Sequence, residues 1–282
     1  MRHPIKLAAA FAALIALTAC GTSDEAEVDR ALQELTAGQD GELNEIFLSV
    51  ADPAEAIAYF SRSLAQDPAN IGLMRGLASS YTRGNRTAEA VPAWQDVTNH
   101  PEATMDDRVE LAGAFIRTNR WDEAEAMLNS VPPTHETYER YRLEAVIADG
   151  NEDWARADSF YEIAAGLTST PANVYNNWGY SKLTRGDYRA AERLFIDALR
   201  QDPTMFTAKN NLVLARAAQR NYDLPVIDMT QVERAQLLHT AALAAIMQND
   251  INIGRGLLQD AIDTHPQHFE EAVRALRALD GA

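Results

Sequence analysis

One stretch of the sequence decides the fold. Residues 172–203 read ANVYNNWGYSKLTRGDYRAAERLFIDALRQDP. Gly186 divides the stretch into two helical patterns, because glycine can adopt the left-handed conformation that ends a first helix. Asp202-Pro203 closes the second pattern, since proline disfavours helix at the residue before it and cannot continue one itself. The stretch predicts two helices joined by a tight turn.

Residue size is patterned along the same two helices. Gly179 and Ala191 are small, which lets the helices approach closely, and Phe195 is the large residue beside them. At the start, Pro171 fits the first turn of a helix, where a missing N–H costs nothing, and Thr170 can cap it. We therefore expect a closely packed helical hairpin that begins near residue 171.

This order of small and large residues resembles the tetratricopeptide repeat, a helix–turn–helix unit of about 34 residues. The same frame, moved along the chain, finds related units on both sides. Their markers are Ala56, Phe60 and Asp67-Pro68; Leu77, Ala78, Tyr81, Ala90, Trp94 and His100-Pro101; Leu111, Ala112, Phe115, Trp121, Ala124 and Leu128; Ala145, Ala148, Trp154, Ala157, Tyr161 and Ala164; Asn211, Leu212 and Ala215; and Leu238, Ala242, Gly254, Leu258, Ala261 and His265-Pro266.

Some units depart from the regular pattern. We expect Pro132-Pro133 to cut the third unit short, one extra residue near Gly150 in the fourth, and a sixth unit whose second helix is broken by Pro225. Gln267–Leu279 reads as a closing helix with its apolar residues on one face. Because a single hairpin cannot bury its own apolar face, neighbours stack. The sequence predicts an all-α superhelical solenoid of about six to seven hairpins; the alternative is an unrelated bundle of alanine-rich helices.

A different signal lies at the start of the chain. A basic beginning leads into an apolar run from Leu7 to Ala19, which ends at Cys20, the only cysteine of the sequence. This is the layout of a secretory signal, and the run is shorter than the about 20 apolar residues of a membrane span. Leu17-Thr18-Ala19-Cys20 resembles the lipobox of bacterial lipoproteins. The resemblance implies that Cys20 is the lipidation site and that residues 1–19 are removed; the alternative is an ordinary secreted protein.

The expected domain organisation follows. Residues 1–19 form the lipoprotein signal peptide, residues 20–36 the segment after the lipidated cysteine, and residues 37–282 the repeat domain. In residues 20–36, Ser23 can cap a helix in which Val28, Leu32 and Leu35 share a face. The same segment can equally be a short acidic tether.

Charge limits the partners. The sequence has 25 Lys and Arg against 41 Asp and Glu, a net charge of −16. Removal of residues 1–19 takes away two basic residues and leaves 23 − 41 = −18. So acidic a chain has no general attraction for nucleic acid or anionic lipid headgroups. Attachment to a bilayer must then come from lipid, and the two or three acyl chains of a lipobox cysteine suffice.

Catalytic signatures are missing from the sequence. It has no His-Glu-x-x-His helix, no Gly-x-Ser-x-Gly elbow and no glycine-rich phosphate loop. We expect no enzyme, no cofactor, no metal and no small-molecule substrate. His265 and His268 have the spacing of metal ligands, but His265 precedes a proline, as His100 does, which favours a capping role. Trp94, Trp121, Trp154 and Trp178 occupy large-residue positions, which favours core packing over an aromatic ligand site.

A stack of this type offers a concave groove lined by the first helix of each hairpin. The candidate partner-binding residues are Asn173, Asn176, Asn177, Tyr180, Asn210, Asn211, Arg75, Arg83 and Arg142. In tetratricopeptide proteins, asparagines at the positions of Asn177 and Asn211 often hold the backbone of an extended peptide. An amide donates and accepts at once, so it can pair with any peptide group. The alternative is that these asparagines only bridge neighbouring helices.

The whole layout resembles a more specific family. A short lipoprotein signal, a stack along the whole chain, an Asn-Asn-Trp-Gly unit and an Asn-Asn-Leu segment are similar to the tight-adherence (Flp) pilus assembly lipoprotein of the TadD type. The resemblance implies a lipid-anchored protein of the outer membrane, facing the periplasm, that helps a pilus secretin to assemble. Gly21 agrees with this location, because Asp after the cysteine favours inner-membrane retention in enteric bacteria. The alternatives are a general envelope scaffold and an accessory of a cell-wall enzyme.

Overall fold

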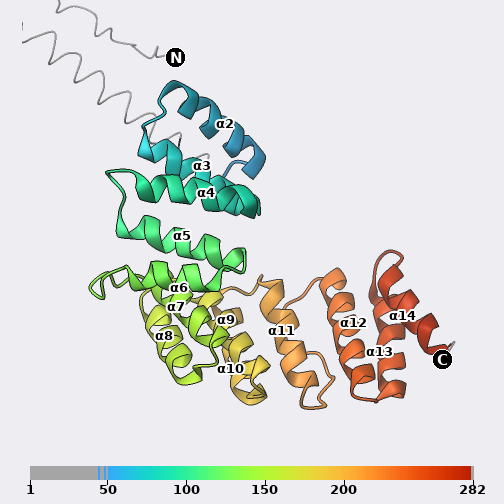
Figure 1. Cartoon of the computed structure of the whole chain (residues 1–282). Helices are drawn as coiled ribbons and strands as arrows, with labels where there is room; N and C mark the ends of the chain where they lie inside the picture. Colours follow the sequence, from blue (N-terminus) through green and yellow to red (C-terminus); the bar gives the residue numbers. More distant parts are fainter. Residues whose placement is uncertain (1–43, 45–47, 49, 281–282) are drawn as a thin grey trace, which may run out of the picture. The chain divides into compact units, whose positions relative to one another are not determined.

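The computed structural model describes Asn44, Leu48 and residues 50–280. The expected signal peptide, Cys20 and the segment 20–36 lie outside these residues. Within them the chain forms 13 α-helices and no strand (Figure 1). The helices are α2 (Pro53–Gln66), α3 (Ile71–Arg83), α4 (Thr87–Asn99), α5 (Met105–Arg117), α6 (Trp121–Asn129), α7 (Tyr138–Gly150), α8 (Trp154–Gly166), α9 (Ala172–Thr184), α10 (Tyr188–Gln201), α11 (Phe206–Ala217), α12 (Gln231–Met247), α13 (Ile251–Thr264) and α14 (Glu270–Asp280). None of these helices has the length and apolar character of a membrane span.

The chain divides into two compact units, one ending at Gly84 and the other beginning at Asn85. In the first unit α2 packs against α3. Phe60 of α2 is fully buried, and a Cβ added to Gly76 of α3 would lie 2.3 Å from its Cε1 atom. The missing side chain of Gly76 is therefore what lets the two helices come this close.

The second unit is a stack of helical hairpins. α5 packs against α6, α7 against α8, α9 against α10 and α12 against α13. Successive hairpins contact each other through α8 and α9, through α10 and α11, and through α11 and α12, and α14 packs against α13 (Figure 1). The prediction of an all-α solenoid of stacked hairpins is confirmed.

The turns show the repeat directly. Six of the described residues have a positive φ, each a few positions after the end of a helix: Asn85, Asn119, Glu152, Gly186, Arg220 and Asn249. They lie 34, 33, 34, 34 and 29 residues apart. The regular steps confirm the phase of the repeats, and the last one confirms that the seventh unit follows a shortened step.

The extra residue expected near Gly150 is wrong. α7 starts 14 residues before the positive φ of Glu152, and α9 starts 14 residues before that of Gly186. The irregular step comes earlier, where α6 ends at Asn129 and Pro132-Pro133 prevents its continuation. The prediction of a short third unit is thereby confirmed.

The hairpin that decided the fold packs as expected. Ala191 and Phe195 are fully buried, and a Cβ on Gly179 would lie 2.7 Å from Cε1 of Phe195. The predicted cap at Thr170 is wrong. Pro171 occupies the N-cap position of α9, where no side chain caps the helix, and the hydroxyl of Thr168 accepts the backbone N–H of Thr170 instead.

The ends of the stack also agree with the sequence. Asp67, His100, Asp202 and His265 are the C-cap residues of α2, α4, α10 and α13. After α11 no helix forms until Gln231, so the second helix of the sixth unit is missing where Pro225 lies. On the closing helix, Phe269, Ala272, Leu276 and Leu279 pack into the core that α12 and α13 share.

Candidate functional site

The first helices of successive hairpins in the second unit line an open pocket of about 390 Å³. α7, α9 and α11 contribute most of its surface, and α8 contributes one side chain. The lining residues are Val146, Asp149, Tyr161, Asn176, Asn177, Tyr180, Thr207 and Asn211. Four of the nine candidate groove residues, Asn176, Asn177, Tyr180 and Asn211, are therefore brought together in one place. We call this the amide pocket.

Two asparagines of the candidate set are linked across the pocket. Nδ2 of Asn211 on α11 donates a hydrogen bond of 3.1 Å to Oδ1 of Asn176 on α9. Asn211 is buried, and its neighbour Asn210 accepts a 2.8 Å hydrogen bond from the hydroxyl of Thr240 on α12. Both residues thus bridge neighbouring helices, which is the alternative that the sequence left open. Contact with a peptide at these positions stays a prediction.

Other members of the set keep their polar groups available. Asn177 is half-buried in the pocket, and Tyr180 stands at its rim with 53% of its surface exposed. Asn173 is exposed at the start of α9 but does not line the pocket. The side chains of these three residues make no hydrogen bond with any residue that the structure describes.

The floor of the amide pocket is a carboxylate held by two hydroxyl groups. The Tyr161 hydroxyl donates to Oδ2 of Asp149 over 2.8 Å, and the Ser181 hydroxyl donates to Oδ1 over 2.6 Å. Tyr161 is 2% exposed, so this contact is sheltered from solvent. Burial raises the pKa of Asp149, although the hydrogen bonds from Ser181 and Tyr161 act in the opposite direction.

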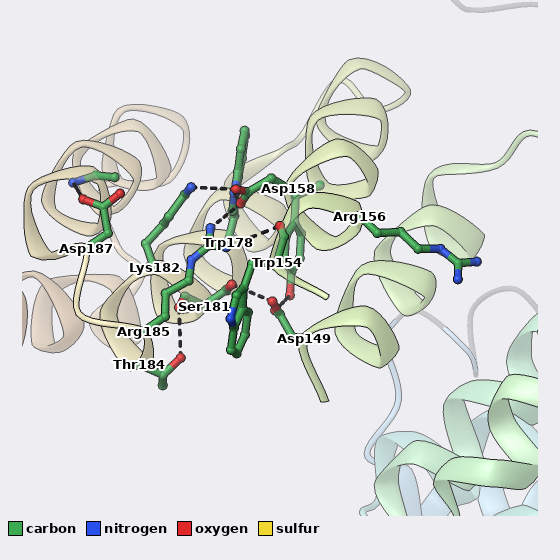
Figure 2. A network of polar contacts seen from close by, with 12 residues as sticks. Asp149, Trp154, Arg156, Asp158, Trp178, Ser181, Lys182, Thr184, Arg185 and Asp187 are labelled. Carbon is green, nitrogen blue, oxygen red and sulfur yellow. Dashed lines mark hydrogen bonds and ion pairs between the residues drawn. The ribbon is translucent and has the colours of Figure 1, made fainter. Parts of the chain in front are cut away.

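A second carboxylate, Asp158 of α8, fixes the position of α9 (Figure 2). It accepts hydrogen bonds from Nε1 of Trp178 at 2.6 Å and from Nζ of Lys182 at 2.8 Å, and it pairs with the guanidinium of Arg185. Burial acts to raise the pKa of Asp158, but the hydrogen bonds from Lys182, Trp178 and Arg185 outweigh it and lower the pKa. Since the donors come from α9 and its C-terminal turn, this network holds the helix that carries Asn176, Asn177 and Tyr180.

The three candidate arginines do not line the amide pocket. Arg75 and Arg83 belong to the first unit, where Arg83 donates a 2.8 Å hydrogen bond to the backbone oxygen of Ala51. Arg142 lies on α7 and forms an ion pair with Glu139, with a 3.0 Å hydrogen bond from its Nε atom. Arg83 and Arg142 thus already have partners within the protein.

The tryptophans are only partly in the core. Trp94 is 3% exposed, and Trp154 and Trp178 are half-buried. For Trp121 the expectation of core packing is wrong, because 41% of its surface is exposed. Trp121 is the first residue of the shortened α6, and its ring lies over Gly150 at the end of α7 rather than between helices.

The histidines near the C-terminus act as the sequence suggested. Nδ1 of His265 accepts the backbone N–H of Gln267 over 3.1 Å, which closes the junction after α13. His100 accepts the backbone N–H of Glu102 in the same way after α4. Nε2 of His268 lies 2.8 Å from a carboxylate oxygen of Glu270. Within the described part of the chain, no group of three or more His, Cys, Asp or Glu has the arrangement of a metal site.

Comparison with known proteins agrees with this geometry. Residues 46–104 and 176–224 match the model of the tetratricopeptide repeat family. Both segments are tetratricopeptide repeats. The second segment contains Asn176, Asn177 and Tyr180, so the amide pocket is built in part by a recognised repeat. The model describes a helical repeat and no catalytic domain.

Solved structures share the fold at low sequence identity. A chain of the APC/C hetero-tetramer Cut9–Hcn1 is 14% identical with a TM-score of 0.59, and the match covers 81% of this chain and 46% of that one. A tetratricopeptide repeat protein from Parabacteroides merdae is 12% identical with a TM-score of 0.56, covering 84% and 96%. A thermophilic tetratricopeptide repeat protein of Thermus thermophilus is 14% identical with a TM-score of 0.55, covering 62% and 95%.

These likenesses concern the fold. The chain spans less than half the length of the Cut9–Hcn1 chain that it matches. A search of curated protein sequences finds no match. What the amide pocket binds must therefore be argued from its own residues.

Proposed function

We propose that the protein is a membrane-anchored scaffold that captures an extended segment of another envelope protein in the amide pocket. The observation that carries this proposal is the position of Asn177 and Tyr180. Both line one pocket formed by three successive first helices, and neither side chain is used within the described structure. Tetratricopeptide repeats are interaction modules, and the two matched segments support a scaffold.

The chemistry of the pocket suits a peptide backbone. An asparagine amide can accept from a peptide N–H and donate to a peptide carbonyl, so it binds a strand without regard to sequence. An exposed tyrosine adds apolar contact and a hydroxyl at the same site, as in many interfaces. The Asn176–Asn211 bridge keeps α9 and α11 in register, and thus holds the two edges of the pocket at a fixed separation.

The proposed anchor rests on the sequence before residue 44. Cys20 closes a signal that resembles a lipobox, and the acidic charge of the chain favours acyl chains over a basic surface for attachment. We place the protein in the cell envelope, held by lipid at the outer membrane and facing the periplasm. The anchor keeps the pocket near the membrane where its partner is assembled.

A narrower proposal concerns the partner. The resemblance to the TadD-type lipoprotein supports a role in assembly of the Flp pilus, with the outer-membrane secretin as the captured protein. The Asn-Asn-Trp-Gly unit that supports this resemblance is the segment that lines the amide pocket. A general scaffold for envelope assembly is the second candidate, favoured by the fact that most of the matching residues are generic to the repeat.

The test is capture from native membranes. The full chain carrying Asn177→Ala and Tyr180→Ala is crosslinked in cells and recovered, and the secretin in the eluate is quantified by mass spectrometry. We expect at least about a tenfold loss of captured secretin, since two hydrogen-bonding contacts at an interface together contribute on the order of 2 kcal/mol. Asn252→Ala, an exposed asparagine on the second helix α13, is the matched control.

Two results would overturn these proposals. Equal capture by the double variant and the unaltered protein, with equal helicity by circular dichroism, would refute the pocket as the binding site. Deletion of the gene with normal secretin multimers and normal piliation would refute the pilus role while leaving a general scaffold in place.

A further inference from the structure

Asp149 differs from the other carboxylate of this region in one respect. Asp158 is neutralised by Lys182 and Arg185. Asp149 accepts only the neutral hydroxyl groups of Tyr161 and Ser181, and it forms no ion pair with any residue in the described part of the chain. Its negative charge is therefore not balanced by a direct partner.

The same carboxylate has unused acceptor capacity. A carboxylate offers about four lone-pair sites, and each oxygen of Asp149 receives one hydrogen bond. Asp149 lines the amide pocket, so the remaining sites can be reached from there. Both hydroxyl contacts fix the carboxylate at the floor, which prepares it for a further donor without rearrangement.

The walls above the carboxylate suit a long side chain. Val146 of α7 and Tyr180 of α9 offer apolar surface on the way from the rim to the floor. Lysine and arginine have apolar stems and a charged end, so they pack along such a wall while the charge reaches a polar group. Asn177 lies beside this path, where it can hold the backbone of the residue that enters.

We propose that the amide pocket receives one lysine or arginine side chain of the partner's extended segment, with its charge paired to Asp149. The proposal rests on the function proposed above and specifies the chemistry of the captured segment. Charge complementarity supports it at longer range, since a chain with a net charge of −16 attracts a cationic segment. Transfer of a charged group into this site is favourable because a fixed countercharge awaits it.

The experiment uses immobilised decapeptides and the purified full chain. Ten uncharged background sequences each carry lysine, arginine, norleucine or glutamate at the fifth position, and the bound protein is quantified at low and at 0.5 M salt. Asp149→Asn keeps the size of the side chain and removes its charge. Glu162→Gln, an exposed carboxylate on α8 outside the pocket, removes the same charge and is the matched control.

We expect the lysine and arginine peptides to retain at least about ten times more protein than the norleucine peptides at low salt. Asp149→Asn should abolish this preference, and Glu162→Gln should keep it. The comparison between peptides uses the unaltered protein, so it decides the matter even where a substitution impairs folding.

Three outcomes count against the proposal in different ways. Binding without preference for a cationic residue overturns the inference and leaves the peptide-binding pocket in place. A cationic preference that Asp149→Asn leaves intact overturns the assignment to Asp149. If no peptide of any class is retained, the proposed function fails, and the inference fails with it.

Discussion

Gly179 of α9 lies so close to Phe195 of α10 that an added Cβ would stand 2.7 Å from the ring. The first unit repeats this relationship, where a Cβ on Gly76 would stand 2.3 Å from the ring of Phe60. In both hairpins the aromatic side chain is fully buried. The distance between paired helices is thus set by a glycine that faces a phenylalanine.

Gly179→Ala is expected to destabilise the protein. Alanine favours a helix by about 1 kcal/mol over glycine, but its methyl group would collide with a buried ring, and overpacking costs about 1–3 kcal/mol. Gly256→Ala in the middle of α13 is the matched control, because an added Cβ there meets nothing within 4 Å. Urea denaturation should show a net loss for Gly179→Ala and a gain for Gly256→Ala. A gain at both sites would contradict the close contact.

Glu152→Gly is expected to stabilise the protein by about 0.5–1 kcal/mol. Glu152 has a φ of 58° in the turn between α7 and α8, a conformation that costs a residue with a Cβ about 1 kcal/mol and glycine nothing. Glu152→Ala keeps the Cβ and should bring no such gain, which makes it the control. Thermal unfolding of the three proteins measures the difference, and equal melting temperatures for the two variants would disprove the backbone strain.

Asp158→Ala is expected to cost about 2 kcal/mol, because Lys182 and Arg185 would lose the acceptor they share in a partly buried site. The pH dependence has a defined sign. The pKa of Asp158 is lowered in the folded protein, so its contribution is complete above the unfolded pKa of about 4 and is lost as pH falls through the folded value. The stability gap between the unaltered protein and Asp158→Ala should therefore close below about pH 4.

Asp149→Asn should behave in the opposite way. Burial raises the pKa of Asp149, so the folded state favours its neutral form. Replacement by the neutral amide should cost little or no stability at pH 7, since it also removes a charge that is unfavourably buried. A loss as large as that of Asp158→Ala in the same urea titration would show that the Asp149 charge stabilises the fold.

Cys20→Ala is expected to release the protein from the membrane. Without the thiol no diacylglycerol can be attached, so the chain should stay uncleaved or become soluble. Membrane fractionation and intact mass measure both outcomes, with Ser23→Ala as the control beyond the lipobox. An unchanged mass and an unchanged membrane fraction would disprove lipidation.

The repeat architecture could be predicted because its markers recur. Small residues at positions such as Gly179, turn residues such as Gly186 and the Asp202-Pro203 stop repeat at nearly constant intervals, and each has a local physical reason. The fates of Trp121 and Thr170 could not be predicted in this way. They depend on the shortened α6 and on a hydroxyl two residues upstream, neither of which follows from the repeat pattern.

The candidate site was foreseen in its amides and missed in its carboxylates. Asn176, Asn177, Tyr180 and Asn211 stand at repeat positions that face the groove. Asp149 and Asp158 find their partners on other helices, 12 to 32 residues away, and nothing in their local sequence distinguishes them from surface acids. A weak signal did exist, since Asp149 lies one residue before the end of its helix, where groove residues recur.

Residues 218–230 leave α11 without a second helix, and this has a consequence for cooperativity. In a linear array the free energy of each repeat is the sum of its own stability and of its interfaces with the two neighbours. α11 brings one helix where its neighbours bring two, so the coupling across it is the weakest step of the second unit. The helices α12–α14 then form a block that can unfold separately from the hairpins before α11, and hydrogen exchange should divide the array at this position.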